Sequence, residues 1–319
     1  MTPTQRSVRR LALIVVLLAI LLAILLAPAT AQASQLIARD AQDVTLQVDA
    51  QGRALVGYRA KGRTWSVLAW GAINALHPTA DRDQVRFSVD YAGGWGKYRK
   101  TLSRAFRNLC RPYSGPPLAW FVAGCTMPDG SHWALQAWQR GLPNLGVDPW
   151  KPLQASSELR LSHWSTELPK LELWVNWAHS KRFDHLFGRY TYLGQPVYGF
   201  RASTKGAPAD GFGRNIYVDT LDSAYGPGWK RENSFLAHEG TGAFCYGLYP
   251  HQPYPGYPAT GVRPPGKGAR YRATAVGPGV LPDVSWEAGA PGAYSPEADK
   301  QLAALQREVY GADTLCKPV

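Results

Sequence analysis

The chain has 319 residues and carries 35 lysines and arginines against 23 acids, a formal net charge of +12. This length can bury a core of ordinary size, in one domain or two small ones. The positive charge favours an anionic neighbour. The basic residues are scattered and form no Lys/Arg run of the kind that follows phosphates, which argues against nucleic acid as a partner.

The N-terminus has the order of a secretory signal peptide: three arginines, an unbroken apolar run from Leu11 to Ala27, and small residues up to Ala33. A membrane span usually needs ~20 apolar residues, so cleavage is favoured over an uncleaved signal anchor. Removal of residues 1–33 would lower the net charge from +12 to +9. We therefore expect a secreted or extracytoplasmic protein that meets a membrane only if this segment is retained.

The cysteine count is even, which for an exported chain predicts disulfides. The four cysteines allow three pairings. We favour Cys110 with Cys125, which closes a short Pro/Gly-rich loop, and Cys245 with Cys316, which would join the tail to the body.

Short β-branched or aromatic runs separated by turn residues predict strands over most of the chain. The expected strands are 44–48, 54–60, 64–70, 85–91, 118–123, 131–139, 159–164, 171–177, 215–220 and 243–248, with two shorter ones within 190–200. The strand 243–248 is expected to be the last well-formed one. A short helix is predicted over 101–109, and the prolines and glycines of 249–268 predict a covering loop.

The C-terminal region begins with Ser295-Pro296-Glu297, a helix start with an N-cap and a proline at the first helical position. We predict a helix from Pro296 to Tyr310 that ends at Gly311. The expected fold is all-β, mainly antiparallel: a β-sandwich or open barrel with Pro/Gly-rich loops and a C-terminal α-helix. Residues 34–294 would form the secreted β domain, with 295–319 packed on it.

Strand alternation predicts where the many tryptophans point. In 171–177, Leu171, Leu173, Val175 and Trp177 share the apolar face, which leaves Glu172, Trp174 and Asn176 on the other. Gln136 and Trp138 oppose Trp133 and Leu135, and Tyr217 and Asp219 oppose Ile216 and Val218. An indole between polar groups suits a sugar ring, although a second buried layer would give the same pattern. The predicted ligand-binding residues are Trp138, Trp174, Asn176, Tyr217 and Trp229, the last in a loop beside two cations.

A pair of acids could hydrolyse a glycan, one protonated and one ionised. The catalytic candidates are Glu172, Asp219, Asp222 and Glu239, which also fit ordinary turn and ion-pair roles. His179, Asp184 and His185 could contribute to a metal site, but their spacing matches no metal motif, so we predict neither a metal nor a cofactor.

The leading hypothesis is a cell-envelope protein that binds a glycan or anionic wall polymer through surface aromatics. The first alternative is a secreted glycan or wall hydrolase, a glycoside hydrolase-like enzyme, that uses two of the four acids. The second is a structural envelope protein without a ligand, in which all of the aromatics belong to the core.

Overall fold

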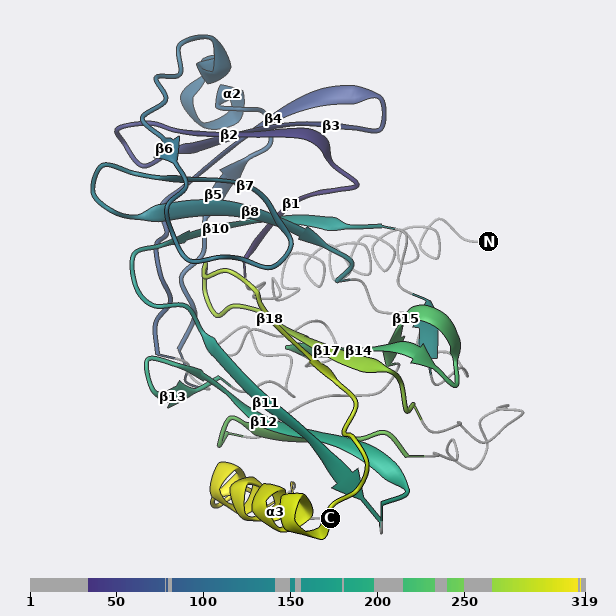
Figure 1. The fold of residues 1–319 in the computed structure, drawn as a ribbon. Coiled ribbons are helices and arrows are strands. Elements are labelled where there is room, and N and C mark those ends of the chain that lie inside the picture. The colour runs from purple at the N-terminus through teal and green to yellow at the C-terminus, as the bar shows by residue number, and fades with distance from the viewer. Residues whose placement is uncertain are drawn as a thin grey trace, which may run out of the picture. The chain divides into compact units, whose positions relative to one another are not determined.

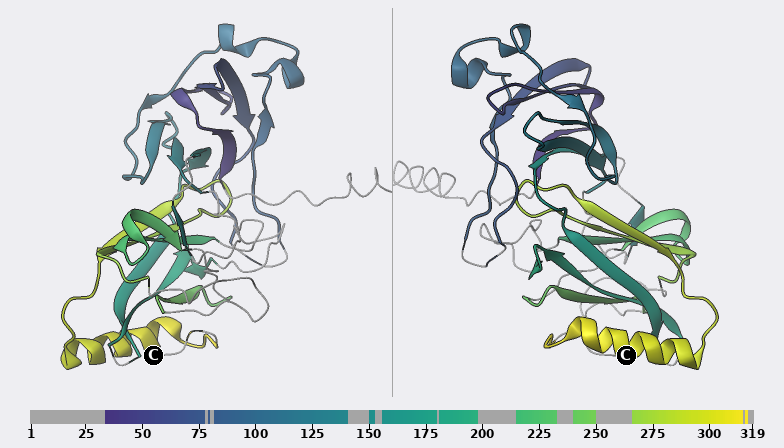
Figure 2. Two further views of the ribbon diagram at one scale, coloured as in Figure 1. Left: turned by 90° about the vertical axis from the view of Figure 1, so that its right-hand side faces the viewer. Right: turned by 60° about the vertical axis from the view of Figure 1, so that its left-hand side comes forward.

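The structure, a computed structural model, describes residues 34–77, 79, 82–140, 150–152, 156–179, 181–197, 215–232, 240–249, 266–314 and 316. These residues form antiparallel strands in several sheets and a long C-terminal helix (Figures 1 and 2). The predicted fold class, a mainly antiparallel all-β protein with a C-terminal helix, is therefore confirmed.

The first two sheets share one hydrophobic core. Their strand orders are β1-β10-β8-β7-β6 and β2-β3-β4-β5. The bounds are β1 Gln35–Arg39, β2 Gln42–Val48, β3 Ala54–Ala60, β4 Arg63–Trp70, β5 Ser88–Asp90, β6 Arg111–Pro112, β7 Phe121–Thr126, β8 His132–Trp138 and β10 Glu158–Trp164. Val56 and Val67 from one sheet pack with Trp133, Leu135 and Leu161 from the other, as in a β-sandwich.

The other two sheets share a second core. One has the order β11-β12-β13 with β16 also paired to β12, and the other has the order β18-β17-β14-β15-β9. The bounds are β9 Trp150–Pro152, β11 Lys170–Ala178, β12 Phe183–Tyr192, β13 Gln195–Pro196, β14 Ile216–Ser223, β15 Gly226–Glu232, β16 Ala243–Gly247, β17 Arg270–Ala275 and β18 Val284–Gly289. Leu186 and Tyr190 pack with Val218, Tyr271 and Ala273 in this core.

The C-terminal helix α3 has the predicted bounds, Pro296–Tyr310, and ends at Gly311. The Ser295 hydroxyl accepts a hydrogen bond from the backbone N–H of Ala298, which satisfies one of the free donors of the first turn. The helix packs on the face of β11, β12 and β16 that lies away from the second core, where Val309 and Tyr310 contact Phe187.

Both favoured disulfides are present, Cys110–Cys125 and Cys245–Cys316. Disulfides form and persist in oxidising compartments, so the two disulfides indicate that the chain resides in such a compartment. Among the described residues, no helix is long and apolar enough to cross a membrane.

Several predicted elements were wrong. The helix expected over 101–109 is only a 3-10 turn, Leu102–Arg104, preceded by a one-turn helix α2, Trp95–Tyr98. The strand β15 lies where a loop was predicted, because Gly226 and Gly228 take positive φ angles of 113° and 76° that lead the chain from the turn into the sheet. The strand 243–248 is followed by two more, β17 and β18.

Candidate functional site

The polar faces of two predicted strands meet, whereas that of the third is turned elsewhere. Trp138 of β8 meets Tyr217 of β14 edge to face, with ring centroids 5.4 Å apart. Trp174 of β11 instead stacks on Phe187, with centroids 5.6 Å apart, in the cluster beneath α3. The three faces therefore do not line one concavity.

Asp219 is the centre of the face on β14. Its carboxylate has no exposed surface and accepts hydrogen bonds from two arginines on the neighbouring strands. Arg231 of β15 donates from Nε to Oδ1 over 2.8 Å, and Arg272 of β17 donates from Nη2 to Oδ2 over 2.9 Å. The cross-strand register places these three residues side by side. One buried anion thus holds two buried cations.

Aromatic rings flank each guanidinium. The Arg231 carbon Cζ lies 5.3 Å from the Tyr217 ring centroid and 5.7 Å from that of Trp138. Arg272 lies 4.2 Å from Trp229 and 4.6 Å from Trp120. Because desolvated cation–π contacts contribute about 2 kcal/mol, this arginine–aromatic stack is a strong internal contact between sheets.

A second buried polar group adjoins the stack. Asp283 accepts from the Trp138 indole N–H over 2.7 Å and from the backbone N–H of Gly277 over 3.0 Å. Nearby, burial and the charge of Arg140 together lower the pKa of Arg160 to about 10, although the ion pair of Arg160 with Glu158 opposes the shift. These groups satisfy one another inside the protein.

Three of the predicted ligand-binding residues are enclosed. Trp138 and Tyr217 are each 3% exposed and Asn176 is 1% exposed. The Asn176 amide oxygen contacts His185 Nδ1 at 2.8 Å. Burial therefore corrects the expectation that these side chains form a surface platform. Trp174 and Trp229 are half-buried.

The candidate acids have separate surroundings. Glu172 pairs with Arg189 on the adjacent strand at 2.6 Å, and Asp219 is inaccessible. Asp222 is exposed and accepts the backbone N–H of Gly228 over 2.7 Å. Glu239 lies outside the described residues. Each described acid has a local partner, which is the structural role that their sequence context also allowed.

The metal candidates do not gather. His179 is exposed and contacts Tyr249 edge to face, while Asp184 bonds to the Tyr271 hydroxyl. Burial raises the pKa of Asp184, and burial together with His179 lowers the pKa of His185 to about 4. Among the residues that the structure describes, no group of three or more His, Cys, Asp or Glu side chains could hold a metal ion.

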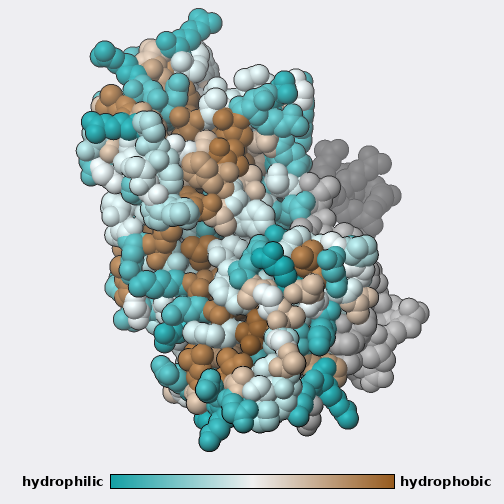
Figure 3. Space-filling model, in the orientation of Figure 1, coloured by the Kyte–Doolittle hydropathy of each residue, from teal (hydrophilic) through white to brown (hydrophobic). Residues whose placement is uncertain are grey.

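A different part of the chain, residues 97–111, carries exposed positive charge without ion pairs among the described residues. Six exposed cations lie within fifteen residues, and none has an ion-pair partner in the described part of the chain: Lys97, Arg99, Lys100, Arg104, Arg107 and Arg111. We call them the basic surface. Exposed rings accompany them, with Trp95 57% and Tyr91 50% exposed. Figure 3 shows hydrophilic residues, with some apolar ones between, over the part that carries α2.

The sequence contains a signal for this surface that a search for contiguous basic runs does not detect. Successive cations are one to four positions apart, and only Arg99 and Lys100 are adjacent, so they form no long run. The segment 91–128 nevertheless contains no aspartate or glutamate. A window that scores the absence of acids would have found it.

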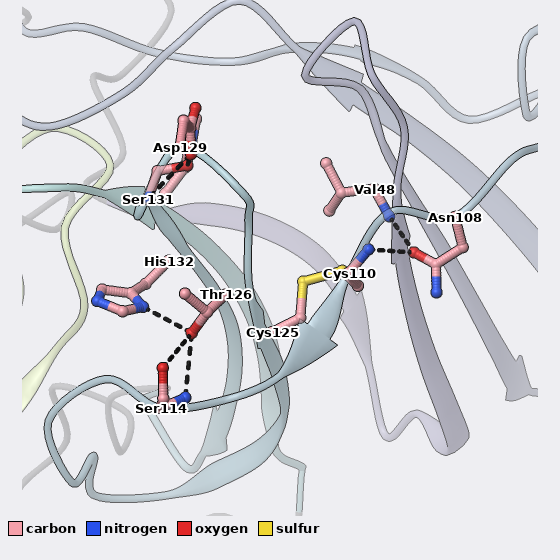
Figure 4. Close-up of a disulfide and its surroundings, with 10 residues drawn as sticks. Val48, Asn108, Cys110, Ser114, Cys125, Thr126, Asp129, Ser131 and His132 are labelled. Atoms are coloured by element: carbon pink, nitrogen blue, oxygen red, sulfur yellow. Dashed lines mark hydrogen bonds between the residues drawn. A yellow bond between two sulfur atoms is a disulfide. The ribbon is translucent and has the colours of Figure 1, made fainter.

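Backbone and side-chain contacts hold this segment in place. The Asp90 carboxylate accepts the backbone N–H groups of Ala92 and Lys97, and such bonds lower its pKa although burial alone would raise it. Tyr98 packs against Trp70 with centroids 5.9 Å apart. At the far end, Cys110 is bonded to Cys125 (Figure 4).

A cavity of about 580 Å³ lies beside the basic surface. It is lined by Asp49, Ala50, Gln51, Arg53, Leu102, Ala105, Phe106, Arg107, Asn108 and Leu109. Its size is within the range of ~300–1,000 Å³ typical of small-ligand sites. The lining therefore includes an aromatic ring, two side-chain amides and two guanidinium groups: those of Phe106, Gln51, Asn108, Arg53 and Arg107.

No protein-family model, curated protein or solved structure matches the chain. What the site can bind therefore follows from its own residues alone. The cations of the basic surface can attract an anion, and its rings can make apolar contacts. Neither kind of contact requires a catalytic group. In the arginine–aromatic stack, by contrast, the charged groups Asp219, Arg231 and Arg272 are buried and paired with one another.

Proposed function

We propose that this protein works in the cell envelope by binding an anionic polymer, most simply a glycan. The observation that carries the proposal is the basic surface with its exposed Trp95 and Tyr91 rings. The charge agrees with the anionic partner expected from the composition, and the rings agree with the expected use of surface aromatics. The contact residues differ from those predicted.

The charge pattern supports a polymer as the ligand. Several unpaired cations spread over fifteen residues suit repeated anionic groups, since each exposed cation contributes only about 0.2–1 kcal/mol. An indole covers the apolar face of a sugar while nearby donors reach its hydroxyls. The hydrolase alternative has no comparable support, because Glu172 and Asp219 are both held in ion pairs.

Binding to polygalacturonate, with neutral dextran as the comparison, tests the proposal. We expect polygalacturonate to bind and dextran not to bind, with the affinity falling as salt screens the exposed charges. Arg99→Gln with Lys100→Gln should raise the dissociation constant about tenfold, since two contacts of about 0.7 kcal/mol sum to that factor.

The matched control removes two charges from α3, Lys300→Gln with Arg307→Gln, both exposed. This variant should bind within twofold of the wild type. Equal losses in both variants would mean that net charge alone attracts the polymer, and no binding of polygalacturonate at low salt would reject the proposal. Binding only to anionic lipid vesicles would assign the surface to a membrane instead.

A further inference from the structure

The cavity beside the basic surface has side-chain oxygens in its lining, but those of Asp49 and Gln51 already accept hydrogen bonds from the protein. Asp49 Oδ1 accepts the backbone N–H groups of Gln51 and Arg53, and Asp49 Oδ2 accepts Arg53 Nε over 2.7 Å. The Gln51 side-chain oxygen accepts Arg53 Nη2 over 3.3 Å.

Asn108, another residue of the lining, shows the same pattern. Its side-chain oxygen accepts the backbone N–H groups of Val48 and Cys110, each over 3.0 Å (Figure 4). An amide side chain has one oxygen and two N–H donors, and the donors of Asn108 and Gln51 have no hydrogen-bond partner among the described residues, so they remain for a ligand. The lining therefore presents donors to whatever enters.

The charge of the lining comes to one unpaired cation. Arg53 is neutralised by Asp49, and its guanidinium lies 5.2 Å from the Tyr98 ring, which fixes its position. Arg107 has no ion-pair partner in the described part of the chain. A ligand with one negative group and several hydroxyl acceptors complements this set.

The apolar lining suits a sugar ring. Phe106 is half-buried and lies outside the buried core clusters, and Leu102, Ala105 and Leu109 lie beside it. An aromatic ring packs on the C–H face of a pyranose, while donors around it hold the hydroxyls.

The walls are fixed before a ligand arrives. The backbone N–H of Leu109 donates to the Val48 carbonyl over 2.8 Å, and the next residue, Cys110, is in a disulfide. A preorganised site loses less conformational freedom on binding, which favours selective contacts.

We infer that this cavity binds one acidic sugar unit of the polymer, with Arg107 on the anionic group, Phe106 on the ring face, and Asn108 and Gln51 donating to oxygen atoms. The inference rests on the proposed function, for which the basic surface supplies the longer contact. The cavity would thus select the sugar, while the surface supplies attraction that does not depend on sugar identity.

Trigalacturonate, an acidic trisaccharide, is the probe, with maltotriose as its neutral counterpart and inorganic phosphate as the anion alone. By titration calorimetry we expect trigalacturonate to bind the full chain at least tenfold more tightly than either comparison. Arg107→Gln and Phe106→Ala should each weaken it at least fivefold. Lys300→Gln removes an exposed charge on α3, outside both the lining and the basic surface, and should change it less than twofold.

Thermal unfolding of each variant would show that the fold is kept. Equal effects of Arg107→Gln and Lys300→Gln, or equal binding of phosphate and trigalacturonate, would overturn the inference. Binding of polygalacturonate without trigalacturonate would reject the cavity but keep the proposed function. Binding of trigalacturonate without any contribution from the basic surface would do the reverse, and no binding of either would reject both.

Discussion

Asp219→Asn should destabilise the protein strongly, because Asp219 is the only acid that contacts both Arg231 and Arg272 among the described residues. Removing one partner of a buried ion pair costs about 3–5 kcal/mol, since the remaining charge stays desolvated. Asparagine keeps one acceptor oxygen for one guanidinium but no charge for either. We therefore expect the free energy of unfolding to fall by about 4 kcal/mol.

Urea unfolding followed by tryptophan fluorescence would measure this loss. A fall of 4 kcal/mol corresponds to about 8–16 °C in melting temperature, using the scale for chains of 150–250 residues. Asp222→Asn is the matched control, because Asp222 lies on the same strand, is exposed and accepts only the Gly228 N–H among the described residues. It should cost less than about 1 kcal/mol.

A loss below about 1 kcal/mol for Asp219→Asn, with an unchanged urea slope, would refute the reasoning. It would mean that the ring contacts, with Glu287 3.8 Å from Arg272, hold the two guanidinium groups without Asp219. The experiment also bears on the hydrolase alternative, since a catalytic carboxylate would affect turnover more than stability.

Three further predictions concern stability. Burial lowers the pKa of His163 and His185 from 6.5 to about 4, so the unfolded chain binds more protons between these values. Stability is then complete above about pH 7 and falls as the pH drops through this window, by on the order of 3 kcal/mol per histidine. Urea midpoints at pH 7.5 and 4.5 would show the fall, and His163→Gln should reduce it; a midpoint independent of pH would contradict the assignment. Ser295→Ala removes the α3 cap and should cost about 1 kcal/mol by thermal unfolding, whereas no change would mean that water replaces the hydroxyl. Cys245→Ser with Cys316→Ser removes a disulfide that spans 71 residues and should lower the free energy of unfolding in denaturant by about 4 kcal/mol. Removal of the Cys110–Cys125 disulfide, which spans 15 residues, should cost less. The reverse order would refute the loop-length reasoning.

Strand alternation predicted which side chains share a face, but not what covers that face. Tyr217 and Asp219 do lie opposite Val218 and Ile216, as predicted. The alternation of side chains along a β-strand sets this arrangement. The partners of the polar face, Arg272 and Trp120, are distant in sequence, so no local pattern could identify the stack. The packing of α3 against Trp174 could not be predicted for the same reason, because the helix is also distant from Trp174 in sequence.

The missed strands have a local explanation. The Gly-Pro-Gly start of β15 has the composition of a turn, and its neighbours on β14 supply the hydrogen bonds that make it a strand. β17, Arg270 to Ala275, contains two arginines, three small residues and one aromatic residue, Tyr271, which gives a weak hydrophobic signal. Both strands depend on tertiary pairing more than on their own propensity.

The acid-free segment 91–128 also affects how the molecule approaches a partner. Its six cations give this region a field of one sign, which acts over about 8 Å at physiological ionic strength. Such a field exerts a torque on a protein that diffuses toward a negatively charged layer, and turns the segment to face it. Under the proposed function, this orientation would be selected during the encounter, before Trp95 or the cavity makes any contact.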